Sequence, residues 1–190
     1  DLLIGVGSRM QAQRMGWGLD EDVKIIHVDI DEEELTRIST PDAAIHADAA
    51  NALPLLIEAL GDQPDRTGWA EKVASVKQEV QTALLADLAP QAAWLSAIRE
   101  ALPRDGIFVD ELTQMGYVSR ILFPTYSPHT FVSTGYQGTL GWGIAATTGA
   151  AHARRDVPVV GIAGDGGALF TITELATAVH HNIPATYIIF

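Results

Sequence analysis

Residues 157–190 read VPVVGIAGDGGALFTITELATAVHHNIPATYIIF, and this stretch decides the fold class. Its first seven residues are apolar and rich in β-branched side chains, which predicts a buried strand over residues 157–163. Gly-Asp-Gly-Gly follows at positions 164–167, and apolar residues at helical spacing then predict one helix over residues 168–180. Another apolar run ends the stretch. The order of strand, glycine turn, helix and strand predicts a parallel α/β unit.

The turn at positions 164–167 combines three glycines with a single acid. Glycine lets the backbone turn tightly and lets a ligand approach the amide groups. The amides that open the following helix favour an anion, and an aspartate beside them suits a hard cation. We therefore predict a phosphate held together with Mg²⁺, with Asp165 as the metal ligand. The alternative is an ordinary turn with an exposed acid.

The rest of the chain also alternates strands with helices, which is typical of parallel sheets that carry helices on both faces. We expect strands at residues 2–6, 23–30, 44–46, 106–110 and 130–133. We expect helices at residues 32–38, 49–60, 68–86, 90–102, 113–123 and 138–154. Asp48 precedes the second of these helices and is expected to be its N-cap.

Residues 61–67, GDQPDRT, separate two groups of predicted elements. We expect part of one α/β domain over residues 1–60 and a linker with a connecting helix over residues 61–88. Part of a second α/β domain is expected over residues 89–190. Both ends of the chain fall within strand-like runs, and a cut strand leaves backbone groups unpaired. The chain is therefore predicted to be a fragment of a longer protein.

Charge and composition limit the kinds of partner. Twelve Lys and Arg residues against 24 Asp and Glu residues leave a net charge of −12. That balance argues against binding to nucleic acid or to an anionic membrane surface. The uncharged residues 130–153 are too rich in Gly, Thr and Ser to predict a membrane span. The chain contains no cysteine, which suits a cytoplasmic protein without disulfides.

Two further segments follow predicted strands. Residues 110–116 read DELTQMG, and residues 135–143 read GYQGTLGWG, with four glycines in nine positions. The first is either a ligand-binding segment or a helix N-cap with solvated acids. The second lets a flat ligand approach the backbone, or else packs tightly against neighbouring helices. Because the carboxyl ends of parallel strands lie along one edge of a sheet, we expect both segments to lie near residues 164–167.

Together these segments resemble the diphosphate-binding domain of thiamine-diphosphate enzymes of the acetolactate synthase and 2-keto-acid decarboxylase family. The motif of that family opens with Gly-Asp-Gly, as at positions 164–166, and closes with Asn-Asn roughly 25 to 30 residues later. Those asparagines would fall just beyond Phe190. Residues 131–150 resemble the family's glycine-rich segment, and residues 110–116 resemble its D-x-G-Q-H region. In this chain Thr113 replaces the glycine of that region and Met115 replaces the histidine.

The resemblance implies thiamine diphosphate and Mg²⁺ as cofactors. The implied reaction decarboxylates a 2-keto acid and transfers the carbanion to a second carbonyl; the alternative is a decarboxylase or lyase of another 2-keto acid or an acyl-CoA. A homodimer or homotetramer is implied as well. The glutamate that activates the cofactor lies on a domain absent from this chain, so we expect the fragment alone to be inactive. The residues assigned to the cofactor are Glu111, Thr113, Gln114, Gly138, Thr139, Leu140, Gly164, Asp165, Gly166 and Gly167.

The first 60 residues resemble the end of the family's middle domain, which implies contacts with the adenine nucleotide of FAD. An arginine can pair with a phosphate, and an acid at a strand end can accept hydrogen bonds from ribose. A non-catalytic nucleotide-binding module is therefore an alternative from another functional class. The segment from Gly5 also imitates a dinucleotide fingerprint, but Met10 occupies the place of its third glycine. The candidate nucleotide residues are Gly7, Ser8, Arg9, Asp29 and Asp48.

Overall fold

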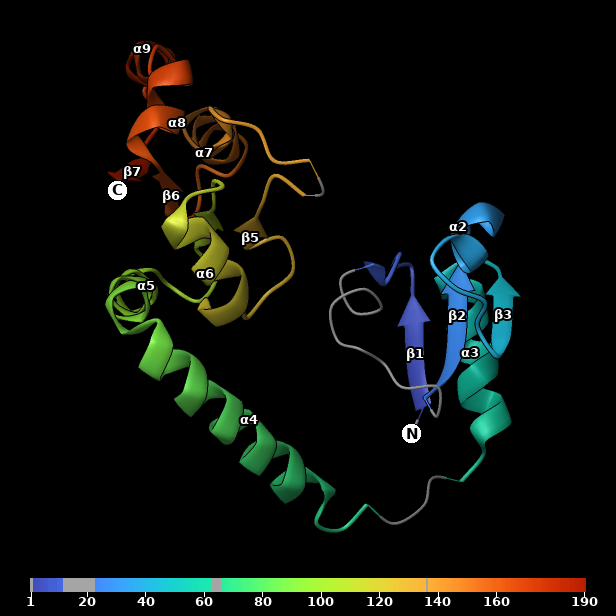
Figure 1. Cartoon of the computed structure of the whole chain (residues 1–190). Coiled ribbons are helices and arrows are strands. Elements are labelled where there is room, and N and C mark those ends of the chain that lie inside the picture. Colours follow the sequence, from blue (N-terminus) through green and yellow to red (C-terminus); the bar gives the residue numbers. More distant parts are fainter. Residues whose placement is uncertain (1, 12–22, 63–65, 136) are drawn as a thin grey trace. The chain divides into compact units, whose positions relative to one another are not determined.

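A computed structural model describes residues 2–11, 23–62, 66–135 and 137–190 of the chain. The chain divides into two compact units, Asp1–Thr67 and Gly68–Phe190. Each unit contains one sheet, and both sheets are parallel (Figure 1). The α/β class predicted from the alternation of strands and helices is confirmed.

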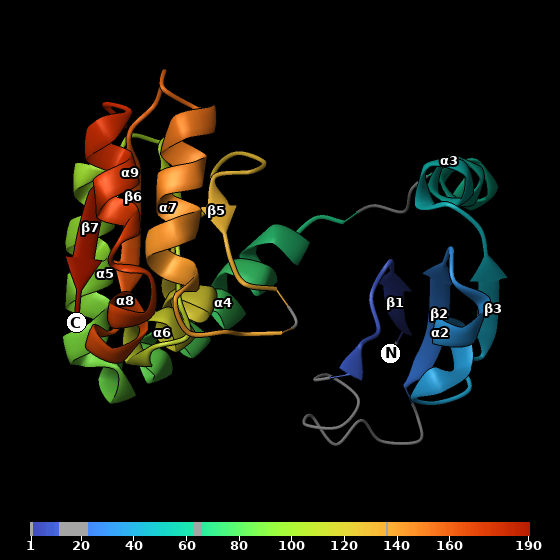
Figure 2. The same cartoon turned by 90° about the horizontal axis from the view of Figure 1, so that it is seen from above.

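The sheet of the first unit has the strand order β1-β2-β3. Its strands are β1 (Leu2–Val6), β2 (Lys24–Asp29) and β3 (Ala43–His46), and its helices are α2 (Glu32–Arg37) and α3 (Ala49–Leu60). The two helices lie on opposite sides of this sheet (Figure 2). The Asp48 carboxylate accepts a hydrogen bond of 2.7 Å from the Ala50 amide, which confirms Asp48 as the N-cap of α3.

Met10 fills the space beside the first strand. A Cβ atom added at Gly5 would lie 2.3 Å from the Met10 sulfur, and the Met10 side chain is buried. The third glycine of a dinucleotide fingerprint leaves room for close helix–strand packing. In this chain the thioether occupies that room, so the turn after β1 differs from a dinucleotide-binding turn.

The second unit contains four strands in the order β5-β4-β6-β7. Its elements are α4 (Trp69–Asp87), α5 (Ala89–Ala101), β4 (Ile107–Val109), α6 (Gln114–Leu122), β5 (Phe131–Val132), α7 (Trp142–Ala153), β6 (Val159–Ala163), α8 (Asp165–Thr171), α9 (Glu174–His180) and β7 (Thr186–Ile189). Thus β4 and β6 are the two inner strands. Their carboxyl ends carry the segments that begin at positions 110 and 164.

The core of the second unit lies on both faces of its sheet. Phe108 of β4 points toward α5 and α6, where its ring stacks on Phe123 with 4.0 Å between the ring centroids. Its neighbours Ile107 and Val109 point the other way and pack with Ala151 of α7. Because side chains alternate across a strand, these three consecutive residues pack against helices on both faces of the sheet. The helices α5 and α6 therefore cover one face, and α7 covers the other (Figure 2).

The prediction of one helix over residues 168–180 is wrong. Gly164 has an extended backbone and its carbonyl accepts from the Ala168 amide, so α8 already begins at Asp165. The Leu175 amide then bonds to the Ile172 carbonyl, a spacing of three residues that interrupts the α-helical pattern and separates α8 from α9. The expected apolar face is also largely uncovered, because Leu169 is 71% exposed and Val179 is 78% exposed.

Two other helices differ from the prediction. The helix expected from position 138 begins at Trp142, because Gly141 has φ = 89° and ends the preceding loop in the left-handed region. The expected amphipathic helix over residues 68–86 is α4, and none of its side chains is buried. No helix within the described ranges is long and apolar enough to cross a membrane.

Candidate cofactor site

Three segments meet at the carboxyl edge of the second sheet, namely residues 110–116, 135–143 and 164–167. Their positions after predicted strands had indicated this arrangement. Glu111 lies two residues beyond β4, and its buried side chain reaches the glycine-rich loop, where the Gly141 amide donates to Oε1 at 2.6 Å. A Cβ atom added at Gly138 would overlap the Leu112 side chain. One added at Gly164 would lie 3.1 Å from the Thr113 methyl group. Segments that are far apart in sequence therefore pack against one another.

The Glu111 carboxyl group lies at the centre of this contact. A Cβ atom at Gly167 would lie 2.4 Å from Oε1, and one at Gly143 would lie 2.8 Å from Oε2. Such distances are too short for a real side chain, so both positions require glycine as long as Glu111 keeps its place. These two glycines approach a protein side chain, whereas we had predicted that Gly167 approaches a ligand.

Burial raises the pKa of Glu111 above its ordinary value of 4.5, and the Gly141 and Gly143 amides lower it by less. Its Oε2 atom is buried without a hydrogen-bonding partner among the described residues. The Gly143 amide faces the carboxyl group, but not in hydrogen-bonding geometry to Oε2. Burial thus shifts the Glu111 equilibrium toward the protonated form relative to an exposed glutamate.

The raised pKa predicts a pH-dependent stability. Above pH 4.5 the unfolded chain loses the Glu111 proton while the folded chain retains it, so the free energy of unfolding should fall as pH rises from that point. Glu111→Gln should remove this fall, and the two proteins should differ progressively more as pH rises. Urea midpoints between about pH 4 and 8 measure the effect. The exposed Glu100→Gln is the control, and parallel profiles for Glu111→Gln and wild type would contradict the prediction.

The Gly-Asp-Gly-Gly segment forms the first turn of α8. Asp165 is exposed, and its Oδ1 atom accepts from the Gly166 amide at 2.7 Å. A Cβ atom added at Gly166 would meet nothing within 4 Å. The Asp165 amide donates to the Phe190 carbonyl at 3.1 Å, so the end of β7 lies beside the acid. This segment has an accessible carboxylate and open space above one glycine.

Sequence reasoning missed a polar network at the same edge. Asp110 is fully buried, and its Oδ2 atom accepts from Arg120 Nε at 2.7 Å and from the Ser133 hydroxyl at 3.3 Å. Arg120 also donates to the hydroxyl groups of Ser133 and Thr134. The network ties the ends of β4 and β5 to α6. The only signal in the sequence was an acid at a strand end, since nothing paired it with an arginine ten residues later.

The candidate nucleotide residues of the first unit lie along the carboxyl edge of its sheet. Gly7, Ser8 and Arg9 follow β1, Asp29 ends β2, and Asp48 lies two residues beyond β3. A Cβ atom added at Gly7 would meet nothing within 4 Å, and its φ is 57°. The structure therefore places the five predicted residues at the ends of adjacent strands.

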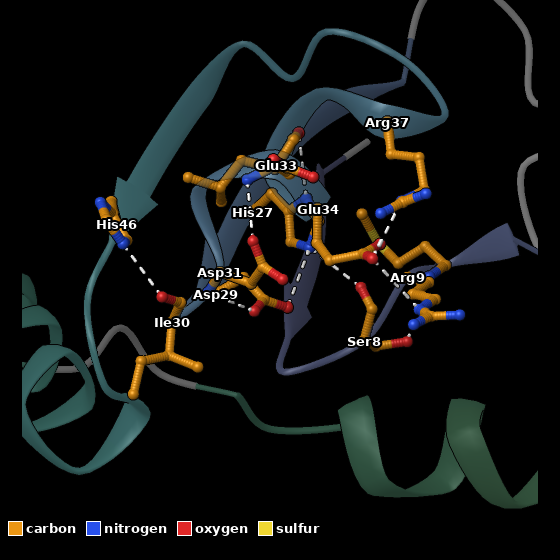
Figure 3. A network of polar contacts seen from close by, with 12 residues as sticks. Ser8, Arg9, His27, Asp29, Ile30, Asp31, Glu33, Glu34, Arg37 and His46 are labelled. Atoms are coloured by element: carbon orange, nitrogen blue, oxygen red, sulfur yellow. Dashed lines mark hydrogen bonds and ion pairs between the residues drawn. The ribbon is translucent and has the colours of Figure 1, made fainter.

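Protein groups already bind several of these candidates (Figure 3). His27 contacts the Ser8 carbonyl at 2.9 Å through Nε2, and the same nitrogen lies 3.8 Å from Asp29 Oδ2. Glu34 is buried and its Oε1 atom pairs with Arg9 Nε at 3.3 Å and with Arg37 Nε at 2.9 Å. Glu34 is a further residue that sequence reasoning missed, because only the fold brings α2 against the turn after β1.

The cap made by Asp48 predicts a measurable contribution to stability. Asp48→Ala removes the acceptor for the Ala50 amide and should lower the free energy of unfolding by about 1 kcal/mol. Urea unfolding of the wild type and the variant measures the difference. Asp48→Asn keeps an acceptor oxygen and is the matched control. Equal losses in both variants would show that charge, rather than the cap, stabilises α3.

Comparison with known proteins finds a family that resembles most of the second unit. Residues 112–190 match the family described as thiamine pyrophosphate enzyme, C-terminal TPP binding domain. Over these residues the chain is similar to the thiamine pyrophosphate enzymes. The match begins at Leu112, beside Glu111, and includes the glycine-rich loop and the Gly-Asp-Gly-Gly segment. The resemblance stated from the motifs is confirmed.

Similarity to curated proteins extends to the first unit as well. The chain is 31% identical over 193 residues to the acetolactate synthase isozyme 1 large subunit of Escherichia coli, covering 100% of the chain and 34% of that protein. It is 34% identical to a probable 2-ketoarginine decarboxylase of Pseudomonas aeruginosa, over 94% of the chain and 32% of that protein. A glyoxylate carboligase of Escherichia coli is 29% identical over 100% of the chain and 34% of its own length. The chain spans about a third of the relatives that it matches.

The residues at the edge of the second sheet fit the cofactor of the thiamine pyrophosphate enzymes. No group of three or more His, Cys, Asp or Glu side chains that could hold a metal occurs in the described ranges. Mg²⁺ needs fewer, because it commonly takes one or two carboxylates together with phosphate oxygens. The exposed carboxylate of Asp165, beside the open space at Gly166, has that chemistry.

The other predicted cofactor residues divide into two groups. Gln114, Gly138, Thr139 and Leu140 are exposed, so their atoms are accessible to a ligand. Thr113 instead caps α6, with its hydroxyl oxygen accepting from the Gly116 amide at 3.1 Å. The Thr113 cap agrees with the alternative of a helix N-cap in residues 110–116, but the acids of that segment, Asp110 and Glu111, are buried rather than solvated. The contacts of Glu111 and Gly167 were not predicted.

Proposed function

We propose that this chain forms part of a thiamine-diphosphate- and Mg²⁺-dependent enzyme that decarboxylates a 2-keto acid and transfers the product carbanion to a second carbonyl. The observation that carries this proposal is the convergence of the loop 138–143 and the segment 164–167 on Glu111 at one sheet edge. The family match over residues 112–190 supports the same cofactor. The relatives named as an acetolactate synthase and a carboligase support the carbon-joining reaction.

In this proposal the cofactor supplies the electron sink for loss of carbon dioxide, and the protein positions it. Asp165 binds Mg²⁺ on the diphosphate, and the Gly166 amide lies next to that site. Leu140 presents an exposed apolar side chain from the glycine-rich loop and supports the rings of the cofactor.

The reaction is tested on the full-length gene product with pyruvate, thiamine diphosphate and Mg²⁺. Formation of acetolactate supports the synthase proposal, and its absence rejects it. Release of carbon dioxide from another 2-keto acid or an acyl-CoA without a carbon-joined product would favour the alternative, a decarboxylase or lyase. The relative named as a 2-ketoarginine decarboxylase supports that alternative.

We also propose that the full-length protein is a homodimer or homotetramer. Large apolar side chains on α8 and α9 are exposed next to the cofactor segment, and such clusters mark interaction sites. They are Leu169 and Phe170 of α8, Ile172 between the two helices, and Val179 of α9. Phe170→Asp should therefore yield monomers in light scattering, whereas Ile121→Asp, on the exposed face of α6, should not. A Phe170→Asp variant that assembles normally would exclude this surface.

A nucleotide site in the first unit is the second candidate function. The open space above Gly7 and the placement of Ser8 and Asp29 at strand ends favour a ligand at this edge. Calorimetry of the full-length protein with FAD and with ADP tests the site. Heat with either ligand at micromolar to millimolar concentration supports it, and no heat at millimolar ligand rejects it.

A further inference from the structure

Glu111 has no role toward the cofactor itself in the proposed function, although the two cofactor segments meet at its side chain. Its carboxyl group is fully buried, so it cannot touch a cofactor or substrate at the exposed edge. A hydrophobic side chain of the same size would fill this space without burying a polar atom. Such a side chain would, however, leave the buried Gly141 amide without its acceptor, which carries a cost of its own.

Gly141 links two segments, because both its backbone amide and its backbone carbonyl form hydrogen bonds. Its amide donates to Glu111 Oε1 at 2.6 Å, and its carbonyl accepts from the Thr171 hydroxyl at 2.8 Å. Thr171 is the last residue of α8, the helix that begins at Asp165. The loop is therefore bonded both to the end of β4 and to the helix that carries the proposed metal ligand.

The same carboxyl group limits how closely α8 can approach. The Gly167 position lies so near to Glu111 Oε1 that an added Cβ atom would be 2.4 Å away. Shortening Glu111 would let α8 move inward, and adding a methyl group at Gly167 would push it outward. The length of this side chain therefore limits the distance between the loop and α8, which also contact each other directly at Gly141 and Thr171.

We propose that Glu111 is a positioning residue that holds the loop 138–143 and the segment 164–167 at the spacing that one thiamine diphosphate requires. The inference rests on the proposed function, in which these two segments contact opposite ends of the cofactor. It differs from a ligand role for Glu111, because the carboxyl group acts through the glycines that it contacts, Gly141, Gly143 and Gly167.

The test is a double-mutant cycle on the full-length protein, with thiamine diphosphate affinity measured by calorimetry at saturating Mg²⁺. Gly167→Ala should weaken binding at least about tenfold, because overpacking a tight contact displaces α8. Glu111→Ala should also weaken binding, since the Gly141 amide loses its acceptor. The double variant should bind better than the product of the two losses predicts, because the new methyl group enters the vacated space.

Two further variants separate positioning from a general loss of packing. Glu111→Gln keeps the length and an acceptor oxygen, and should bind within about threefold of wild type. Gly149→Ala is the matched control: its added Cβ meets nothing within 4 Å, and binding should not change. Independent losses from Glu111→Ala and Gly167→Ala, or wild-type affinity in Glu111→Ala, would overturn the inference.

The melting temperature of each variant without cofactor keeps the two proposals distinguishable. Wild-type protein that binds no thiamine diphosphate would reject the proposed function. The spacing role of Glu111 would then be judged on melting temperatures alone. Coupling between Glu111→Ala and Gly167→Ala in that measurement supports the spacing role, and additive changes overturn it.

Discussion

Replacing Asp165 with alanine is expected to weaken Mg²⁺-dependent binding of thiamine diphosphate by at least about a hundredfold. Losing a group that merely supports a metal ligand typically costs 10- to 100-fold in metal affinity, so losing the ligand itself should cost more. Asp165 is exposed at the end of β6, and its side chain makes only a local hydrogen bond to the Gly166 amide among the bonds described. Removing the Asp165 side chain should therefore weaken cofactor binding far more than it lowers the stability of the fold.

The measurement is calorimetric titration of the full-length protein with thiamine diphosphate, with and without Mg²⁺. Asp165→Asn keeps the acceptor for Gly166 but removes the charge, and it should lose binding almost as strongly as Asp165→Ala. Asp105→Ala removes an exposed acid from the loop before β4 and is the charge control. Unchanged affinity in Asp165→Ala would refute the assignment of the metal ligand.

The second large effect is expected at the ion pair between Asp110 and Arg120. Arg120→Met should lower the free energy of unfolding of the second unit by about 3 kcal/mol, because it leaves a buried carboxylate without its cation. Asp110 is 0% exposed, but the Arg120 side chain is 31% exposed. The expected loss of stability is therefore at the lower end of the range found when buried ion pairs are broken. The Ser133 hydroxyl remains as a weaker partner at 3.3 Å.

Urea unfolding gives the total change, and hydrogen exchange of peptides from residues 107–122 assigns it to the second unit. The double variant Asp110→Asn/Arg120→Met removes both charges and should recover part of the loss. Ile121→Ala lies beside Arg120 on the exposed face of α6 and should change stability by less than about 0.5 kcal/mol. A loss below 1 kcal/mol in Arg120→Met would mean that solvent screens the Asp110 charge.

The predictions that succeeded rest on local patterns. Apolar runs predicted the strands β1 and β6, and Asp48 was predicted as the N-cap of α3 from its place before a helical pattern. Three segments together, at residues 110–116, 135–143 and 164–167, resembled the family whose model matches residues 112–190. In each case the residues that determine the feature are neighbours in the chain, so their spacing carries the information.

The predictions that failed depend on contacts between distant residues. Residues 168–180 have helical spacing throughout, yet the helix starts at Asp165 and is interrupted after Thr171, whose hydroxyl bonds to Gly141 thirty residues earlier. The same pattern gave the expected helix an apolar face that includes Leu169 and Val179, and both side chains are exposed in this chain. A periodic pattern shows that a helix has an apolar face, but it does not show what covers that face.

By itself, the sequence determined the parallel α/β class and the strand that leads into the Gly-Asp-Gly-Gly segment, and its motifs resembled one family. These follow from short-range spacing, because backbone geometry converts a pattern of neighbours directly into strands, caps and turns. Only the tertiary structure decided that Glu111 is buried between Gly141 and Gly167 and that Asp110 pairs with Arg120. Burial and pairing arise where separate strands end at one edge, and no local pattern encodes which side chains meet there.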